Sequence, residues 1–186
     1  VINRQKDLNI VYSPLHGTGR VIIPAALRTW GFQNIHVVAE QMVVDGNFPT
    51  VVSPNPENSE AMTMGMNLGT KLNADLVIAS DPDADRLAIV CRNDKGEWEI
   101  LNGNQTAMMF SWYIITNKKK LGQLKGNEFM VKTIVTSELI ADIARKNNVE
   151  LYDEYTGFKW IAYRIRENEG VKKYIGGGEE SFGFLP

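Results

Sequence analysis

The residues best suited to do chemistry are three aspartates that alternate with other residues in the segment 81–86, DPDADR. In an extended chain, residues two apart project to the same side at a spacing of about 6–7 Å. A curl of the segment would bring the three carboxylates toward one point. Like charges do not stay so close without a cation between them, and hard oxygen ligands suit Mg²⁺. The spacing therefore predicts a magnesium site formed by Asp81, Asp83 and Asp85.

Three alternatives to a magnesium site involve the same aspartates. An EF-hand loop needs Gly at its sixth position and Glu near its twelfth, but Arg86 and Arg92 stand there. An acidic surface turn is the plainest alternative. The Asp-x-Asp pattern after an apolar strand also resembles the nucleophile loop of haloacid-dehalogenase-like phosphatases, with Asp81 as nucleophile. That family usually has Thr or Val where Asp85 stands and a later Gly-Asp pair, and this sequence has no such pair.

A second candidate loop is the glycine-rich segment 176–183, GGGEESFG. Glycines let the backbone approach a ligand closely. Glu179 and Ser181, two residues apart, can point the same way and offer acceptor and donor groups to neighbouring sugar hydroxyls. A plain turn explains this motif equally well when it is taken alone.

Two further turns stand where a helix begins. In the segment 156–160, TGFKW, free backbone N–H groups and Lys159 favour an anion such as phosphate; an N-capped helix with a buried Trp160 is the alternative. The segment 13–19, SPLHGTG, lacks the G-x-G-x-x-G dinucleotide fingerprint. We expect His16 to be structural, because a lone histidine without an acidic or cysteine partner is seldom catalytic.

Strand and helix signals alternate along the chain and place these loops between elements. Apolar runs predict strands at 9–12, 35–39, 75–79, 87–91, 129–135, 150–153 and 173–175. Helices are predicted to run up to about 30 and over 55–72, 104–116, 137–147 and 157–167. Asn55-Pro56 and Ser137 are read as helix starts. The alternation predicts two tandem three-layer α/β units with mixed, mostly parallel sheets, covering residues 1–101 and 102–186.

Composition narrows the range of partners. The net charge of −2 and the lack of a basic stripe argue against nucleic acid or an anionic membrane surface. No apolar stretch approaches the ~20 residues that span a bilayer. Cys91 is the only cysteine, so an internal disulfide is excluded and a reducing cytoplasm fits.

Taken in order, the loops resemble the α-D-phosphohexomutase superfamily, which includes phosphoglucomutases and phosphomannomutases. The matching stretches are SPLHGTG at 13–19, SPNPE at 53–57, DPDADR at 81–86, TGFKWI at 156–161 and GEESFG at 178–183. The DPDADR and TGFKW spellings look most like the phosphoglucomutase branch. That branch also contains phosphopentomutases and sugar-bisphosphate synthases.

The resemblance implies a role for each matched residue. Members have four domains around a cleft, the first three being similar α/β units with four-stranded sheets, and this chain matches the second and most of the third. Arg86 would contact the catalytic phosphate. The remaining residues would be the magnesium ligands Asp81, Asp83 and Asp85, the sugar-hydroxyl contacts Glu179 and Ser181, and the cleft-lining Thr156, Gly157 and Lys159. Phe158 stands where many phosphomannomutases carry His, so the role of that His does not transfer.

The reaction that the resemblance implies is an intramolecular phosphoryl transfer. A phosphoserine donates its phosphoryl group to a glucose or mannose phosphate, and a bisphosphate such as glucose 1,6-bisphosphate returns the other group. In the family, the phosphoserine loop lies in the first domain and a phosphate-clamping loop lies in the fourth. A basic residue just beyond the GEES loop would fall after Pro186. We therefore expect a fragment that is inactive alone; a non-catalytic sugar-phosphate-binding module is the remaining alternative.

Overall fold

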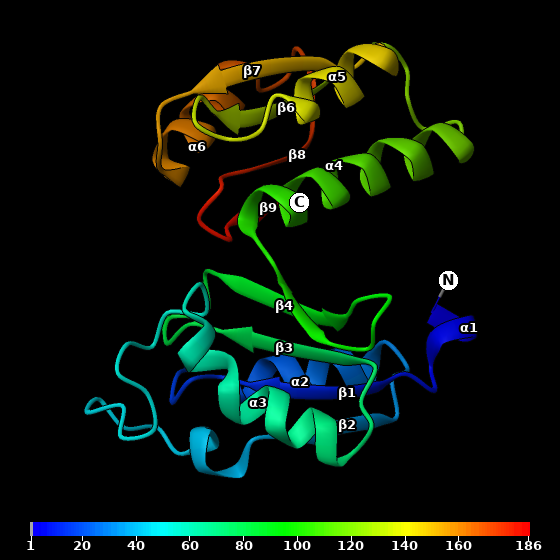
Figure 1. The fold of residues 1–186 in the computed structure, drawn as a ribbon. Coiled ribbons are helices and arrows are strands. Elements are labelled where there is room, and N and C mark those ends of the chain that lie inside the picture. The colour runs from blue at the N-terminus through cyan, green and yellow to red at the C-terminus, as the bar shows by residue number, and fades with distance from the viewer. Residues whose placement is uncertain (1) are drawn as a thin grey trace. The chain divides into compact units, whose positions relative to one another are not determined.

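The computed structural model describes the backbone of residues 2–186 and the side chains of residues 4–186. The chain divides into two compact units, the first ending at Leu101 and the second running from Asn102 to Pro186 (Figure 1). None of the helices in residues 2–186 combines the length and hydropathy that a membrane crossing requires.

The first unit is built on a five-stranded mixed sheet with the strand order β2-β1-β3-β4-β5. Strand β1 is parallel to β2 and β3, whereas β4 is antiparallel to β3 and β5. The strands are β1 (Asn9–Ser13), β2 (Asn34–Val37), β3 (Leu76–Ser80), β4 (Leu87–Arg92) and β5 (Trp98–Leu101). The helices are α1 (Ile2–Gln5), α2 (Gly19–Thr29), the 3₁₀ helix η1 (Ala39–Met42) and α3 (Ser59–Lys71).

Helices α2 and α3 cover opposite faces of this sheet (Figure 1). The crossover through α2 leads from β1 out to β2, and the crossover through α3 leads back past β1 to β3. Because parallel crossovers are right-handed, connections that run in opposite directions along the sheet lie on opposite faces. The three layers bury β1 almost completely at Ile10, Val11 and Tyr12. The predicted α/β class is confirmed.

Two local predictions in the first unit were wrong. The sheet has five strands instead of four, because Asn93 closes a tight turn by accepting hydrogen bonds from the N–H groups of Lys95 and Glu97, and β5 then pairs with β4. Helix α3 begins at Ser59 instead of at Asn55-Pro56. The Asn55 side chain accepts from the Glu57 N–H at 2.9 Å, which makes a local turn in place of a helix start.

The second unit has a four-stranded mixed sheet with the order β7-β6-β8-β9. Strand β6 is parallel to β7 and β8, and β9 is antiparallel to β8. The strands are β6 (Glu128–Thr133), β7 (Glu150–Glu154), β8 (Lys173–Gly178) and β9 (Phe184–Leu185), and the helices are α4 (Gly103–Lys120), α5 (Leu139–Lys146) and α6 (Phe158–Glu167).

Alternate residues of β6 supply the cores on the two faces of this sheet. Met130 packs with Ile115 of α4 and Ala144 of α5 on one face. Phe129 and Val131 pack with Ile161 of α6 on the other face. Because successive side chains of β6 point to opposite faces, helices pack on both sides of the sheet, and the second unit also has three layers.

Several elements of the second unit differ in length from the prediction. Helix α4 continues to Lys120 instead of ending near 116, and β6 ends at Thr133 instead of at 135. Helix α5 begins at Leu139, two residues after the expected start, although the Ser137 hydroxyl still accepts from the Leu139 N–H at 3.3 Å. Strand β8 extends through Gly176–Gly178, which the sequence placed in the following loop. These glycines pair with Met130–Lys132 of β6. Local propensity would leave a run of glycines irregular, but hydrogen bonds to the neighbouring strand keep it extended.

Candidate functional site

The acidic loop, residues 81–86, joins the adjacent antiparallel strands β3 and β4. Ser80 at the end of β3 is paired with Leu87 at the start of β4, so the loop must turn back at once. The Ala84 N–H donates to the Asp81 carbonyl at 3.1 Å, and Ala84 has a left-handed φ of 65°. The loop is therefore curled, as the aspartate spacing required.

The three aspartates of this loop converge. Asp81, Asp83 and Asp85 each offer a carboxylate oxygen, and these oxygens lie within 4.8 Å of one another. Asp81 is 7% exposed, whereas Asp83 and Asp85 face solvent. Burial, together with the neighbouring charges of Asp85 and Asp83, raises the pKa of Asp81 to about 6, although the hydrogen bond from the Arg86 N–H opposes the rise. The cluster carries more negative charge than its surroundings neutralise.

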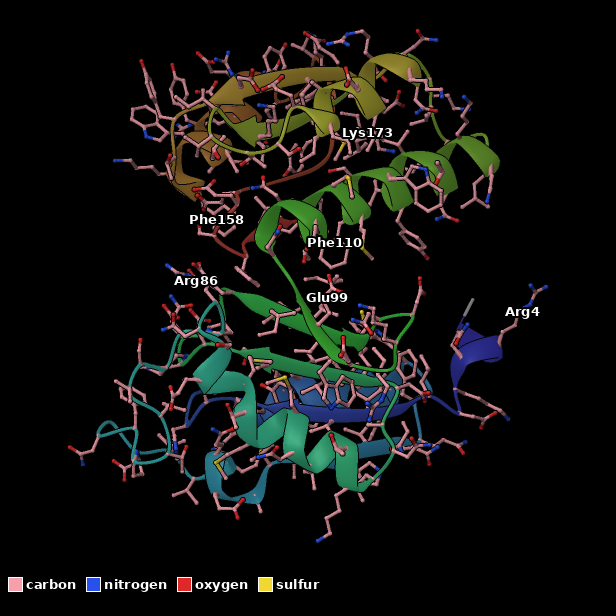
Figure 2. The ribbon with its side chains drawn as sticks, in the orientation of Figure 1. Arg4, Arg86, Glu99, Phe110, Phe158 and Lys173 are labelled. Atoms are coloured by element: carbon pink, nitrogen blue, oxygen red, sulfur yellow. The ribbon has the colours of Figure 1, made fainter. Side chains whose placement is uncertain are left out.

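Arg86, which immediately precedes β4, forms ion pairs with these carboxylates (Figure 2). Its Nε lies 3.8 Å from Asp81 Oδ2 and 4.0 Å from Asp85 Oδ1, and its guanidinium also lies 3.6 Å from Glu57 Oε1. These long contacts divide one positive charge among several carboxylates. Arg86 is half-exposed, so its guanidinium can also reach a bound anion.

The donor set fits a magnesium ion. Mg²⁺ takes oxygen ligands at about 2.0–2.1 Å in an octahedron and keeps open positions for water or phosphate oxygen. Ligand oxygens in such a shell lie about 3–4 Å apart, so carboxylates already within 4.8 Å of one another need only a small contraction. Burial and, to a smaller extent, the neighbouring carboxylates raise the pKa of Asp81, and a cation bound here would stabilise its ionised form.

The acidic loop is supported by the turn between β1 and α2, which sequence reasoning did not connect with it. The N–H and the hydroxyl of Thr18 both donate to the Pro82 carbonyl, at 2.8 and 3.0 Å. A Cβ on Gly17 would lie 2.3 Å from the Pro82 Cα, so only glycine allows this approach. Gly17 in the SPLHGTG segment was the available sequence signal for a close backbone approach, but it did not indicate which segment approaches.

His16 of the same turn has partners within the fold. Its Nδ1 lies 2.8 Å from the Val43 carbonyl oxygen and its Nε2 lies 2.8 Å from the Thr50 hydroxyl. The residue is 2% exposed. Both ring nitrogens are engaged in holding the segment after β2, which supports the structural role expected for this histidine.

In the second unit, the two predicted substrate loops lie together. The GEES loop, residues 178–183, is closed by the Glu179 N–H donating to the Gly183 carbonyl at 3.0 Å. The Gly157 N–H donates to Glu179 Oε2 at 3.1 Å, joining segments separated by a helix and a strand. Glu179 is 8% exposed and Ser181 is half-buried. The bond from the Gly157 N–H fixes the orientation of this nearly buried carboxylate.

Helix α6 begins directly after Gly157, which has a φ of 112° and provides no side-chain cap. Thr156 and Lys159 are exposed, and the Lys159 ammonium lies 5.1 Å from the centroid of the half-buried Trp160 ring. The alternative, an N-capped helix with a solvated Lys159 and a buried Trp160, is correct for Lys159 but wrong for the cap and for Trp160. An uncapped helix start leaves backbone N–H groups for an anion.

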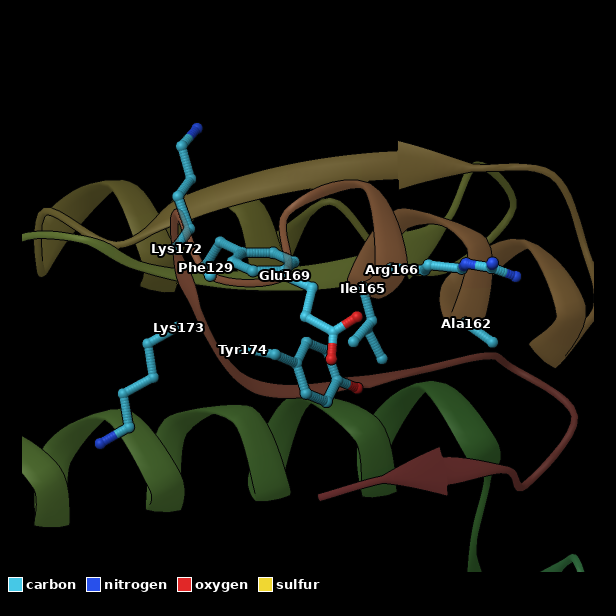
Figure 3. Close-up of a pocket in the computed structure, with 9 residues that line it drawn as sticks. Phe129, Ala162, Ile165, Arg166, Glu169, Lys172, Lys173 and Tyr174 are labelled. Carbon is cyan, nitrogen blue, oxygen red and sulfur yellow. The ribbon is translucent and has the colours of Figure 1, made fainter.

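A separate groove in the second unit does not include any predicted substrate residue. It lies at the C-terminal end of α6 and the start of β8 (Figure 3). Its apolar floor and charged rim are formed by Phe129, Ala162, Ile165, Arg166, Glu169, Gly170, Lys172, Lys173 and Tyr174. The candidate substrate contacts are therefore those of the GEES loop and the start of α6.

Comparisons with known proteins agree with the fold and the motifs. Residues 2–96 match the family model for phosphoglucomutase/phosphomannomutase, alpha/beta/alpha domain II, and residues 102–186 match the model for domain III. A phosphoglucomutase of Staphylococcus aureus (strain MRSA252) is 40% identical over 181 residues, which cover 97% of this chain and 32% of that protein. The chain thus spans about a third of the length of the curated relatives it matches.

Solved structures show the same fold at low sequence identity. A phosphoglucomutase/phosphomannomutase family protein from Burkholderia thailandensis has a TM-score of 0.71 and 21% identity, covering 96% of this chain and 35% of that one. An Aspergillus fumigatus N-acetylphosphoglucosamine mutase, in complex with GlcNAc-6P and magnesium, has a TM-score of 0.66 and 14% identity, covering 98% and 38%. With two consecutive family models matched along almost its whole length, the chain belongs to the phosphoglucomutase/phosphomannomutase family.

Proposed function

We propose that this chain forms the magnesium-binding and sugar-binding parts of a phosphosugar mutase of the phosphoglucomutase type. The observation that supports this most strongly is the convergence of Asp81, Asp83 and Asp85 in a chain of this family. The reaction is an isomerisation that interconverts a sugar 1-phosphate and a sugar 6-phosphate. Glucose and mannose phosphates are the proposed substrates, and glucose 1,6-bisphosphate is the proposed intermediate.

The acidic loop is proposed to act on the phosphoryl group. Asp81, Asp83 and Asp85 would hold Mg²⁺, which supplies positive charge to the phosphoryl oxygens during transfer. The half-exposed guanidinium of Arg86 would leave its long contacts with Asp81 and Asp85 and pair with a phosphate. The hydrogen bonds from the N–H and the hydroxyl of Thr18 to the Pro82 carbonyl keep the loop in place while these charges change.

The second unit is proposed to hold the sugar and an anionic group. Glu179, oriented by the Gly157 N–H, would accept from a sugar hydroxyl, and the Ser181 hydroxyl would exchange a second hydrogen bond with the sugar. Thr156, Gly157 and Lys159 would receive the non-transferring phosphate at the start of α6. The bisphosphate must bind in two orientations during the reaction. These contacts allow both orientations if they are made to sugar hydroxyls that occupy equivalent positions in the two.

The phosphoserine that donates the phosphoryl group is carried by the first domain in this family, and a phosphate clamp by the fourth. We therefore propose that domains II and III act together with those parts. A cytoplasmic location belongs to the same proposal and is supported by the single cysteine, Cys91.

The proposal is tested by assaying conversion of glucose 1-phosphate to glucose 6-phosphate with a protein of full family length that contains this sequence. Activity is expected with Mg²⁺ and glucose 1,6-bisphosphate, and it is expected to disappear when EDTA is added. The 186-residue chain alone should show no turnover above a contaminant control. A full-length protein that converts none of the glucose, mannose or ribose phosphates would refute the proposal, and trapping of an aspartyl-phosphate at Asp81 would favour a phosphatase.

A further inference from the structure

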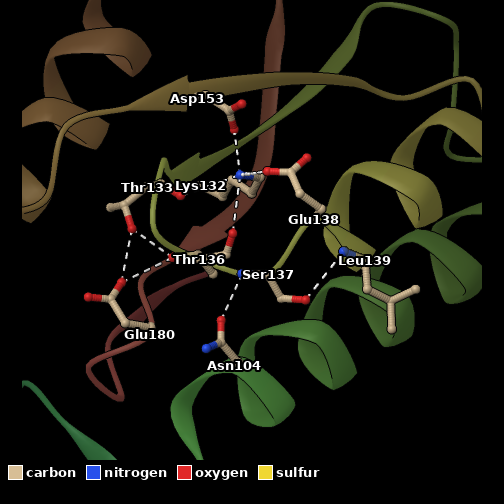
Figure 4. Close-up of polar contacts among 9 residues, drawn as sticks. All are labelled: Asn104, Lys132, Thr133, Thr136, Ser137, Glu138, Leu139, Asp153 and Glu180. Carbon is tan, nitrogen blue, oxygen red and sulfur yellow. Dashed lines mark hydrogen bonds and ion pairs between the residues drawn. The ribbon is translucent and has the colours of Figure 1, made fainter.

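Glu180 stands between the two proposed sugar contacts, Glu179 and Ser181, but its half-buried carboxylate is bound to side chains of the second unit. Its Oε2 accepts from the hydroxyl of Thr133 at 3.1 Å and from that of Thr136 at 3.2 Å (Figure 4). Both threonines are buried, at 0% and 2% exposure. A carboxylate bound to buried hydroxyls at the end of a neighbouring strand is an anchor for the loop that carries it.

The two threonines form a compact unit under this anchor. Their hydroxyl oxygens lie 2.6 Å apart, and the Thr136 N–H donates to the Thr133 carbonyl at 2.9 Å. Two hydroxyl protons serve the contacts among Thr133, Thr136 and Glu180, so one hydroxyl can donate to the other while the second donates to the carboxylate. The three side chains are therefore linked to one another whichever hydroxyl donates to the carboxylate.

The turn 133–136 is itself fixed by a buried lysine. Lys132 has no exposed surface, and its ammonium donates to the carbonyls of Thr133 and Thr136 at 3.5 and 3.2 Å. It also pairs at 2.8 Å with both Glu138 and Asp153. Burial lowers its pKa, but the hydrogen bonds to Asp153 and Glu138 outweigh burial and raise it. The ammonium thus stays charged and keeps the two threonine hydroxyls under the GEES loop.

The backbone of Glu180 is confined from another side by the first residue of α4. A Cβ on Gly103 would lie 1.7 Å from the Glu180 carbonyl oxygen and 2.8 Å from the Phe182 N. The loop therefore rests directly on the start of α4, whose neighbour Asn104 also accepts from the Ser137 N–H at 2.7 Å. Glu180 is held at its carboxylate and at its carbonyl, which leaves the adjoining peptides little freedom to move.

We propose that Glu180 is a positioning residue: through Thr133 and Thr136 it keeps the GEES loop in the conformation in which Glu179 and Ser181 bind sugar hydroxyls. Glu180 itself does not touch the substrate. This inference deepens the proposed function and rests on it for the identity of the ligand. Preorganisation of this kind lowers the free-energy cost of ordering the loop when the sugar phosphate binds.

The test uses the full-length protein and compares Glu180→Ala with the near-isosteric Glu180→Gln, whose amide oxygen can still accept from a threonine hydroxyl. Glu180→Ala is expected to lower kcat/KM for glucose 1-phosphate at least tenfold, mainly through KM, without changing the Mg²⁺ concentration for half-maximal activity. Glu180→Gln should stay within about threefold of the wild type. The Thr133→Val/Thr136→Val pair should resemble Glu180→Ala, and adding Glu180→Ala to it should cause little further loss.

Hydrogen–deuterium exchange of the segment 176–183 supplies a readout that does not depend on turnover. Exchange should rise in Glu180→Ala and in the double threonine variant, and stay unchanged in Glu180→Gln and in the exposed control Glu169→Ala. If the wild type lacks mutase activity, the proposed function fails, and the exchange data still decide whether Glu180 positions the loop. Wild-type exchange and kinetics in Glu180→Ala, or a Glu180→Gln variant as impaired as Glu180→Ala, would overturn the inference.

Discussion

The acidic loop and the GEES loop both display carboxylates, but they treat the negative charge in opposite ways. In the acidic loop, three carboxylates gather within 4.8 Å with a single arginine at 3.8 Å or more. In the GEES loop, Glu179 accepts from the Gly157 N–H and Glu180 accepts from Thr133 and Thr136. The first loop has charge left for an external cation, whereas the second uses its charge to fix its own shape. This contrast predicts different effects of the same kind of substitution.

The largest effect is expected from removing a charge in the acidic loop. Asp83→Asn keeps nearly the same shape but removes one ligand charge, and it should lower kcat of the full-length enzyme by about 100-fold, because electrostatic stabilisation acts on charge that develops during transfer. KM should change much less. Steady-state kinetics over a magnesium titration measure both.

The matched control for Asp83→Asn is Asp94→Asn, an exposed aspartate in the turn between β4 and β5 of the same unit. It should behave like the wild type. An Asp83→Asn enzyme with unchanged kcat at saturating magnesium would contradict the assignment of the metal site.

The next effect is expected in the GEES loop, and it should leave the metal untouched. Glu179→Gln should lower kcat/KM about tenfold to a hundredfold, since a lost charge-assisted hydrogen bond costs roughly 1.5–3 kcal/mol. Ser181→Ala should cost less, because a neutral hydroxyl makes a weaker bond. Magnesium affinity should be unchanged in both variants.

Kinetics of both variants with glucose, mannose and ribose 1-phosphates test this prediction. The substrate with the largest loss identifies the sugar that the loop reads. Wild-type kinetics on all of these substrates would reduce the GEES loop to a plain turn and remove the proposed distinction between the two loops.

A pH titration separates the loops through the pKa of Asp81, which lies at about 6 in the metal-free fold. Protonated Asp81 cannot bind Mg²⁺, so magnesium affinity should be full above about pH 7 and fall by up to about tenfold per unit below about pH 6. The raised pKa of Asp81 also determines how the stability of the metal-free fold changes with pH. Protonation of Asp81 stabilises the metal-free fold below its unfolded pKa of about 4, and this contribution is lost as the pH rises through about 6.

Isothermal titration calorimetry of Mg²⁺ binding between pH 5 and pH 8 measures this effect. Proton release on binding should be seen near pH 5 and should vanish near pH 8. An affinity that does not depend on pH across this range would show that Asp81 is not a ligand or is ionised throughout.

The smallest effect is expected at the support of the acidic loop. Thr18→Val removes one of two hydrogen bonds to the Pro82 carbonyl and should lower stability by about 0.5–1.5 kcal/mol, with a twofold to threefold loss of magnesium affinity. Thermal unfolding and the same calorimetry provide the measurement. Thr29→Val, which removes an exposed hydroxyl bond within α2, is the control and should leave magnesium affinity unchanged.

Local sequence patterns were sufficient for the α/β class, the acidic triplet and most of the strands and helices, but they missed β5 and β9. Apolar alternation reports burial directly, and aspartates at positions 81, 83 and 85 must converge once adjacent antiparallel strands close the loop. The proximity of the GEES loop to the start of α6 could be expected only from the resemblance to the phosphohexomutase superfamily. No periodicity indicates that Gly157 donates to Glu179.

The contacts that hold the loops in place depend on the order of the strands in each sheet. Thr18 reaches Pro82 because β1 lies beside β3, and Thr133 reaches Glu180 because β6 lies beside β8. Such partners are separated by 64 and 47 residues, and their hydrogen bonds form only after a sheet has brought distant strands together. Residue type sets which groups can bond, but strand order and packing select the pairs that do, because a hydrogen bond requires atoms within about 3 Å.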